Sequence, residues 1–118
     1  MTSVEIDPGR SSQAADNLDR AGLRERVDLR VQDTAATLAR SADAHWDLIF
    51  LDAERPAYPG YWPDLLRVLR PGGLLAVDNV LSHACEGAAF RRLVSAQSGV
   101  SEVLVPVGAG LLLVVKAD

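Results

Sequence analysis

The hydrophobic pattern of the chain predicts strands that alternate with helices. Apolar runs at residues 2–6, 27–31, 47–51 and 74–77 are each followed by a segment of helical character, at residues 7–21, 34–42, 62–69 and 86–97. Two further apolar runs close the chain, at residues 103–107 and 111–115. The connection between this last pair is too short for a parallel crossover, so we expect an antiparallel hairpin. The pattern therefore predicts an α/β fold with a mostly parallel sheet and a C-terminal antiparallel β-hairpin.

Local signals indicate where the first helix begins and ends, and how exposed two of the strands are. Asp7 is a favourable N-cap residue, Pro8 suits the first helical position and Gly22 is a common stop residue. Residues 27–31 alternate between apolar and charged side chains, which is typical of a half-exposed edge strand. Residues 48–51 are apolar without alternation, so we expect this strand to be covered on both faces.

Composition narrows the class of protein. The 118 residues are enough for one core, so we expect a single domain over residues 1–118. A net charge of −4 argues against nucleic acid as the main partner, because phosphate binding needs a basic face. The sequence contains neither a membrane-length apolar run nor a signal peptide before its first charges. The single cysteine, Cys85, cannot form an internal disulfide, which favours a cytoplasmic protein.

Oxygen-bearing side chains follow two of the predicted buried strands. Asp52 comes directly after residues 47–51, and Asp78 and Asn79 come directly after residues 74–77. The carboxyl ends of parallel strands meet at one edge of an open α/β sheet, where ligands bind. Carboxylate and amide oxygens are hard ligands that suit Mg²⁺ or Ca²⁺. The alternative is a set of turn residues, because Asp and Asn are common at strand ends.

Six short motifs, taken together, point to one known family. They are Val4-Glu5-Ile6-Asp7-Pro8, Trp46-Asp47-Leu48-Ile49-Phe50-Leu51-Asp52-Ala53, Leu69-Arg70-Pro71-Gly72-Gly73, Val77-Asp78-Asn79-Val80-Leu81, Pro106-Val107-Gly108 and Gly110-Leu111-Leu112-Leu113-Val114. In their order and spacing the chain resembles the cation-dependent O-methyltransferases, which include the catechol and caffeoyl-CoA O-methyltransferases. The resemblance runs from the second strand of that fold to its last strand. It implies a Rossmann-like class I methyltransferase fold, with S-adenosylmethionine and a divalent cation (Mg²⁺ or Ca²⁺) as cofactors.

The resemblance assigns the oxygen cluster to metal binding. Asp52, Asp78 and Asn79 match the metal ligands of the family, and Asp52 is also placed among the catalytic and cofactor-contacting residues. The ion would bind two oxygens of a vicinal hydroxyl substrate, lower the pKa of one and hold it in line with the sulfonium methyl group. The implied function is therefore methyl transfer to a hydroxyl group of a small, aromatic metabolite.

The remaining family positions concern the cofactor and the catalytic base. Glu5 matches the acid that accepts hydrogen bonds from the cofactor ribose, and a carboxylate can accept from both hydroxyl groups of a diol. Asp33 and Thr34 lie where the family contacts the adenine. Arg55 stands where the family often has a lysine that acts as general base. Arginine keeps its proton, so Arg55 would instead stabilise an anionic oxygen.

The chain also departs from the family pattern at its N-terminal side. Counterparts of the family's first strand and of its Gly-rich cofactor loop are missing, so we expect an N-terminally truncated domain. The strands that end near Glu5 and Asp52 would then have unpaired edges, which favours a homo-oligomer. The alternative is that these two strands pair with each other, which would also close the cofactor crevice. Two other interpretations stay open: a non-catalytic remnant or interaction module, and a nucleotide-binding protein that shares only the fold.

Five side chains near the predicted site match no catalytic motif. Tyr58, Tyr61 and Trp62 favour packing at the start of a helix, with an aromatic wall for a substrate ring as the alternative. His83 is expected in a surface loop close to the site. Cys85 is expected to be a small residue near a helix start, since no neighbouring motif indicates nucleophilic chemistry.

Overall fold

The computed structural model describes residues 1–81 and 84–118, and its internal contacts divide the chain into two compact units. The first unit is Met1–Arg40 and the second is Ser41–Asp118. The single domain over residues 1–118 stays a prediction. No helix in the described ranges is both long enough and apolar enough to cross a membrane.

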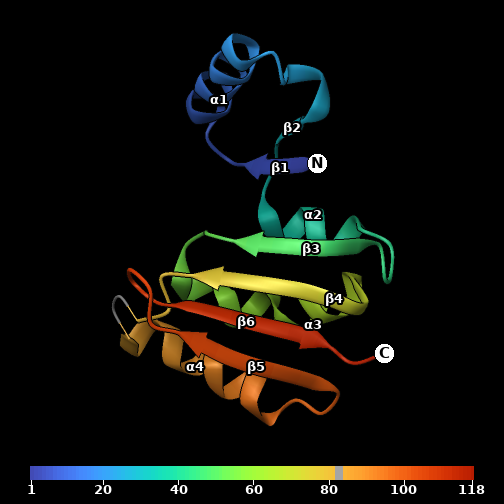
Figure 1. Ribbon diagram of the computed structural model, residues 1–118, viewed down its shortest axis with the longest axis vertical. Coiled ribbons are helices and arrows are strands. Elements are labelled where there is room, and N and C mark those ends of the chain that lie inside the picture. The colour runs from blue at the N-terminus through green and yellow to red at the C-terminus, as the bar shows by residue number, and fades with distance from the viewer. Residues whose placement is uncertain (82–83) are drawn as a thin grey trace. The chain divides into compact units, whose positions relative to one another are not determined.

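The first unit is a two-stranded parallel sheet with helices. In chain order its elements are β1 (Thr2–Glu5), α1 (Pro8–Ala21), the 3₁₀ turn η1 (Arg24–Arg26), β2 (Asp28–Val31) and α2 (Thr34–Arg40). The two strands pair in parallel, and helix α1 connects them (Figure 1). The predicted helix signals are confirmed: the Asp7 carboxylate accepts a hydrogen bond from the Gly9 N–H at 2.8 Å, and Gly22 ends the helix with φ of 71°.

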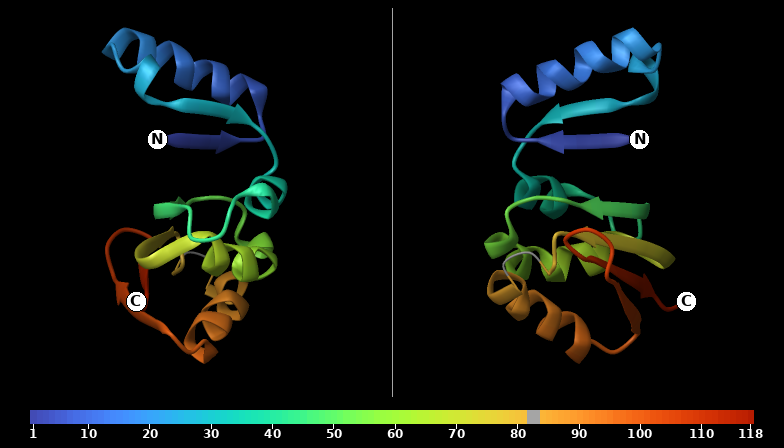
Figure 2. Two further views of the ribbon diagram at one scale, coloured as in Figure 1. Left: turned by 90° about the vertical axis from the view of Figure 1, so that its right-hand side faces the viewer. Right: turned by 60° about the vertical axis from the view of Figure 1, so that its left-hand side comes forward.

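The second unit is a four-stranded sheet with two long helices on one face (Figure 2). Its elements are β3 (Trp46–Leu51), the 3₁₀ turn η2 (Arg55–Ala57), α3 (Tyr58–Val68), β4 (Leu69–Asp78), α4 (Ala84–Ala96), β5 (Val100–Val105) and β6 (Leu111–Lys116). The strand order is β3-β4-β6-β5; β3 and β4 are parallel, and β6 is antiparallel to both of its neighbours. The α/β class and the C-terminal hairpin are confirmed, although the described strands pair as two sheets.

The buried core lies almost wholly in the second unit. In the first unit Leu38 is the one buried hydrophobic residue. In the second, Phe90 from α4 packs edge-on against Tyr58 and Trp62 from α3, with ring centroids 5.7 Å apart in both pairs. On β3, Leu48 and Phe50 are each 60% exposed. The expectation that both faces of this strand are covered is therefore wrong, because helices cover only one face.

The junction between α3 and β4 also differs from the sequence prediction. The helix begins four residues before the predicted start at residue 62, and the strand begins at Leu69 instead of residue 74. The reason is a bulge: the register shifts between Trp46 and Leu48 on β3, so that residues 70–73 of β4 lie opposite the single residue Asp47. Gly72 has φ of 80°, which glycine adopts without strain. The other elements agree with their predicted bounds within three residues.

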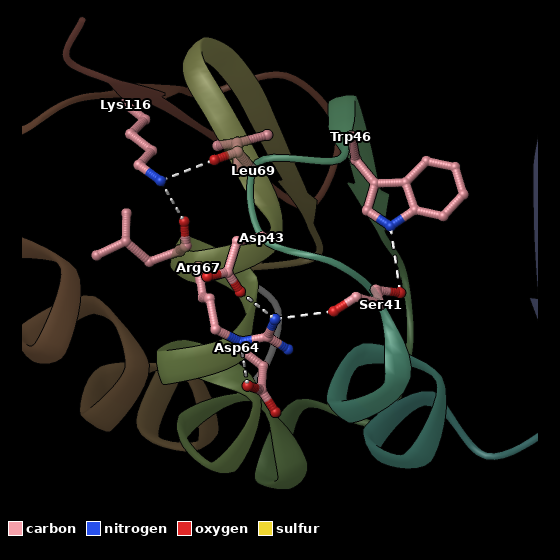
Figure 3. A network of polar contacts seen from close by, with 8 residues as sticks. Ser41, Asp43, Trp46, Asp64, Arg67, Leu69 and Lys116 are labelled. Atoms are coloured by element: carbon pink, nitrogen blue, oxygen red, sulfur yellow. Dashed lines mark hydrogen bonds and ion pairs between the residues drawn. The ribbon is translucent and has the colours of Figure 1, made fainter.

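A polar network secures the C-terminal end of α3 (Figure 3). Lys116, the chain's one lysine, donates hydrogen bonds to the carbonyl oxygens of Leu66 at 2.9 Å and Leu69 at 2.8 Å. The last carbonyl groups of a helix have no partner within the helix, and a lysine there also complements the helix dipole. Arg67 adds hydrogen bonds to Asp43 at 2.7 Å and to Asp64 at 3.1 Å, and these raise its pKa.

Replacing Lys116 tests this end cap. We expect Lys116→Met to lower the free energy of unfolding by about 1.5 kcal/mol, because two half-buried carbonyl groups lose a charged donor. Arg70→Met is the matched control: Arg70 is exposed and pairs with exposed Asp47 at 2.6 Å, and surface pairs of this kind contribute little. Urea denaturation followed by tryptophan fluorescence measures both losses. Equal losses in the two variants would contradict the capping role.

Candidate functional site

Asp52 and Asp78 lie at the same edge of the four-stranded sheet. Strands β3 and β4 are parallel neighbours, and the register pairs Leu51 with Val77. Asp52, directly after β3, therefore lies level with Asp78, the last residue of β4. The Asn79 side-chain N–H donates a hydrogen bond to Asp52 at 3.0 Å, which joins the two strand ends. The structure thus brings together all three oxygen-bearing residues, and their role as metal ligands stays a prediction.

Asn79 has an unusual backbone conformation that orients this contact. Its φ is 61°, in the left-handed region that asparagine tolerates better than most residues. In this conformation its backbone N–H donates to the Asp78 carboxylate at 2.8 Å, while its side chain reaches Asp52. One residue therefore fixes a carboxylate on each of the two strand ends.

The segment that follows Asn79 is held by the turn between β5 and β6. The Leu81 N–H donates to the Ala109 carbonyl at 2.8 Å, and the Val80 N–H donates to the Gly110 carbonyl at 3.3 Å. Gly110 has φ of 90°, and a β-carbon there would approach the Leu81 side chain to 2.5 Å. Only glycine fits this close approach, and the Gly110-Leu111 motif thereby helps to fix the end of β4.

The donor set suits a hard divalent cation. Asp52 and Asp78 each accept a hydrogen bond on one carboxylate oxygen, and their other oxygens have no such partner among the side chains that the structure describes, those of residues 1–81 and 87–118. The Asn79 amide directs its N–H to Asp52, which leaves its carbonyl oxygen available within the same ranges. Those ranges contain no group of three His, Cys, Asp or Glu placed to hold a metal, so any site here needs the amide as well as both carboxylates.

Substitution of Asn79 separates its backbone role from its side-chain role. Glycine and alanine both remove the amide, but only glycine adopts the left-handed conformation without strain. We expect Asn79→Gly to unfold with a free energy about 1 kcal/mol higher than Asn79→Ala. Urea denaturation of the two variants measures the difference. An alanine variant as stable as the glycine variant would show that residue 79 does not need the left-handed conformation.

Tyr58 contacts the loop that carries Asp52, although the sequence indicated packing, with an aromatic wall for a substrate ring as the alternative. It is the first residue of α3 and only 1% exposed, so the packing prediction is confirmed for it and for Trp62, which is 5% exposed. In addition, its hydroxyl group makes two hydrogen bonds to Ala53, in the loop that carries Asp52. Burial raises the pKa of Tyr58, and the negative charges of Asp52 and Asp78 add to the rise. The phenol therefore stays neutral and can both donate and accept.

The predicted cofactor residues lie in the first unit. Glu5 ends β1, and Asp33 and Thr34 follow the parallel strand β2, so these residues share the carboxyl edge of the two-stranded sheet. Glu5 forms an exposed ion pair with Arg10 at 3.8 Å. Asp33 accepts a hydrogen bond from the Ala36 N–H at 3.2 Å and thus caps α2. Their assignments to ribose and adenine stay predictions.

Three other predicted positions are Arg55, His83 and Cys85. Arg55 begins η2, directly after the loop of Asp52 and Ala53, and its charge acts on Tyr58. This places Arg55 beside the oxygen cluster, and its catalytic role stays a prediction. His83 lies outside the described residues, and so does the side chain of Cys85.

Comparison with known proteins agrees with this geometry. Residues 1–117 match the model of the O-methyltransferase family. A catechol O-methyltransferase of Niastella koreensis is 37% identical over 84 residues, which cover 69% of this chain and 38% of that protein. A putative O-methyltransferase of Mycolicibacterium paratuberculosis is 30% identical over 98% of this chain and 58% of its own length.

Comparison with solved structures supports the same family. The O-methyltransferase from Bacillus cereus in complex with SAH is 25% identical, with a TM-score of 0.85 over 98% of this chain and 62% of that one. The chain thus spans less than two thirds of the length of these relatives. It has the Rossmann-like fold of class I methyltransferases and belongs to the O-methyltransferase family.

Proposed function

We propose that this protein transfers a methyl group from S-adenosylmethionine to a hydroxyl oxygen of a small, aromatic metabolite, with the help of a divalent cation. The observation that carries the proposal is the contact between Asn79 and Asp52 at 3.0 Å, which joins two strand ends with three oxygen-bearing side chains. Family membership supports the reaction, and the catechol O-methyltransferase among the relatives supports the substrate class.

In this proposal Asp52, Asp78 and Asn79 would hold Mg²⁺ or Ca²⁺. The cation, when bound, supplies the Lewis acidity that lowers the pKa of a substrate hydroxyl group. Asp52, Asp78 and Asn79 would thereby orient the acceptor oxygen of the substrate. A new bond from this oxygen to the methyl carbon would form as the C–S bond of the sulfonium breaks, and the hydroxyl proton would pass to solvent. Arg55 contributes a fixed positive charge near the developing oxyanion and takes no proton.

The cofactor would be held through the first unit. Glu5 would accept hydrogen bonds from the ribose hydroxyl groups, for which its ion pair with Arg10 is exposed enough to rearrange. Asp33 and Thr34 would contact the adenine. The single cysteine supports a reducing, cytoplasmic setting for this chemistry.

We also propose that the protein forms a homo-oligomer. Among the described strands, β1 pairs only with β2 and β3 pairs only with β4, so each has one edge without a strand partner. Folded proteins usually cover such edges. Light scattering coupled to size-exclusion chromatography measures the mass. A monomer at all concentrations would contradict this part of the proposal.

Calorimetric titration with S-adenosylmethionine, with and without Mg²⁺, tests the proposed function. We expect the cofactor to bind in both conditions, because Glu5, Asp33 and Thr34 lie in the first unit and only Asp52 is assigned to both the cofactor and the cation. A catechol added to the cofactor complex should bind only when Mg²⁺ is present. Absence of cofactor binding in both conditions would contradict the enzyme and favour an interaction module.

A further inference from the structure

Tyr58 makes two hydrogen bonds to one residue of the loop that follows β3. Its hydroxyl oxygen accepts from the Ala53 N–H at 3.0 Å, and its hydroxyl proton is donated to the Ala53 carbonyl at 2.9 Å. Ala53 lies between Asp52 and Glu54, where the chain has left the sheet and the next turn has not begun. The Tyr58 hydroxyl group thus satisfies both the backbone N–H and the backbone carbonyl of Ala53, as a neighbouring strand would.

The position of the hydroxyl group is itself determined by the core. Tyr58 is 1% exposed and Phe90 is fully buried, and their rings meet edge-on at 5.7 Å. Tyr61, one helical turn further along α3, also lies beside the Tyr58 ring, with ring centroids 6.4 Å apart. Because the ring has little freedom, the hydroxyl group holds Ala53 at a defined place relative to α3 and α4.

The loop held in this way carries one half of the oxygen cluster. Asp52 directly precedes Ala53, and its carboxylate accepts the hydrogen bond from Asn79 at 3.0 Å. Asn79 and Asp78 are held from the other side by β4 and by the turn before β6. A shift of Ala53 would therefore move Asp52 away from two partners that do not move with it.

We propose that Tyr58 is a positioning residue, which holds Asp52 at the distance from Asp78 and Asn79 that cation binding requires. This inference rests on the proposed function, and it assigns Tyr58 no contact with substrate or cofactor. Groups that hold a metal ligand in place typically change metal affinity by about 10- to 100-fold when they are replaced. Tyr58 acts in this way through the backbone of the residue next to the ligand.

Tyr58→Phe is the test, because it keeps the ring and its packing and removes only the hydroxyl group. We expect calorimetric titration with Mg²⁺ to give a dissociation constant about 10- to 100-fold higher than that of the wild type. Hydrogen exchange of the Ala53 amide should become faster in the variant, since that N–H loses its acceptor. Val94→Ala is the matched control: it opens a cavity in the core from α4 at a side chain that is 1% exposed, and it keeps the Tyr58 hydroxyl group.

The outcomes distinguish this inference from the proposed function. A wild type that binds no Mg²⁺ overturns the proposed metal site and, with it, the role of Tyr58. If the wild type binds Mg²⁺ and Tyr58→Phe binds it equally tightly, the positioning role alone is overturned. Val94→Ala should lower the melting temperature and leave the Mg²⁺ affinity unchanged. If this control loses as much Mg²⁺ affinity as Tyr58→Phe, the positioning role is also overturned, because any weakening of the core would then lower the affinity.

Discussion

Asp78→Ala is expected to abolish the stabilisation of the protein by Mg²⁺. A cation present at about 100 times its dissociation constant stabilises the folded wild type by about 2.7 kcal/mol, which raises the melting temperature of a chain of this size by roughly 10 °C. Asp78 supplies one of the two carboxylates of the predicted site, so its loss should remove this rise. Both tryptophans, Trp46 and Trp62, lie in the second unit, so the fluorescence of a thermal melt reports on the unit that contains the site.

Asp47→Ala is the control for this experiment. It removes the same charge from β3, the strand that leads to Asp52, but Asp47 lies near the opposite end of that strand, in an exposed pair with Arg70. We expect this variant to keep the full shift in melting temperature with Mg²⁺. An unchanged shift in Asp78→Ala, or a shift lost equally in both variants, would refute the assignment of Asp78 as a ligand.

Phe90→Ala is expected to have the largest effect on stability. Phe90 is fully buried and contacts the rings of both Tyr58 and Trp62. Truncation of such a side chain leaves a cavity and typically costs about 3 to 5 kcal/mol. Domains of this size are stable by only about 5 to 15 kcal/mol, so the variant should be close to unfolded under mild conditions.

Leu93→Ala provides the comparison on the same helix. Leu93 is 41% exposed, so we expect it to lose about 1 kcal/mol or less. Urea denaturation followed by tryptophan fluorescence measures both variants, and the wild-type slope should be retained. Losses of similar size at the two positions would contradict the view that the second unit is organised around Phe90.

The sequence predicted the features that depend on local signals and on strand period. Asp7 and Gly22 delimit α1 because capping requires only residues near the helix ends. The convergence of Asp52 with Asp78 was also predictable, because neighbouring parallel strands place their carboxyl ends at one edge. The hairpin of β5 and β6 followed from the length of its connection.

Other features could not be predicted because they depend on contacts between distant residues. The early start of β4 requires the bulge at residues 70–73, whose pairing with β3 is a matter of register. Tyr58 was indicated as a packing residue or as part of an aromatic wall, and its hydrogen bonds to Ala53 were not predicted, since sequence alone does not show where a phenol hydroxyl points. The left-handed conformation of Asn79 depends on the partners of its amide. Exposure of Leu48 and Phe50 shows that an apolar strand need not be covered on both faces.

The central claim is that Asp52, Asp78 and Asn79 form a cation site that serves methyl transfer, and one assay tests it most directly. The 118-residue protein is incubated with S-adenosylmethionine labelled in its methyl group and with catechol, in Mg²⁺ or in EDTA. We predict that label appears on a catechol oxygen in Mg²⁺, stops appearing in EDTA and appears again when excess Mg²⁺ is restored. Transfer at the same rate in EDTA would contradict the role of the cation, and absence of transfer in Mg²⁺ would contradict the proposed enzyme.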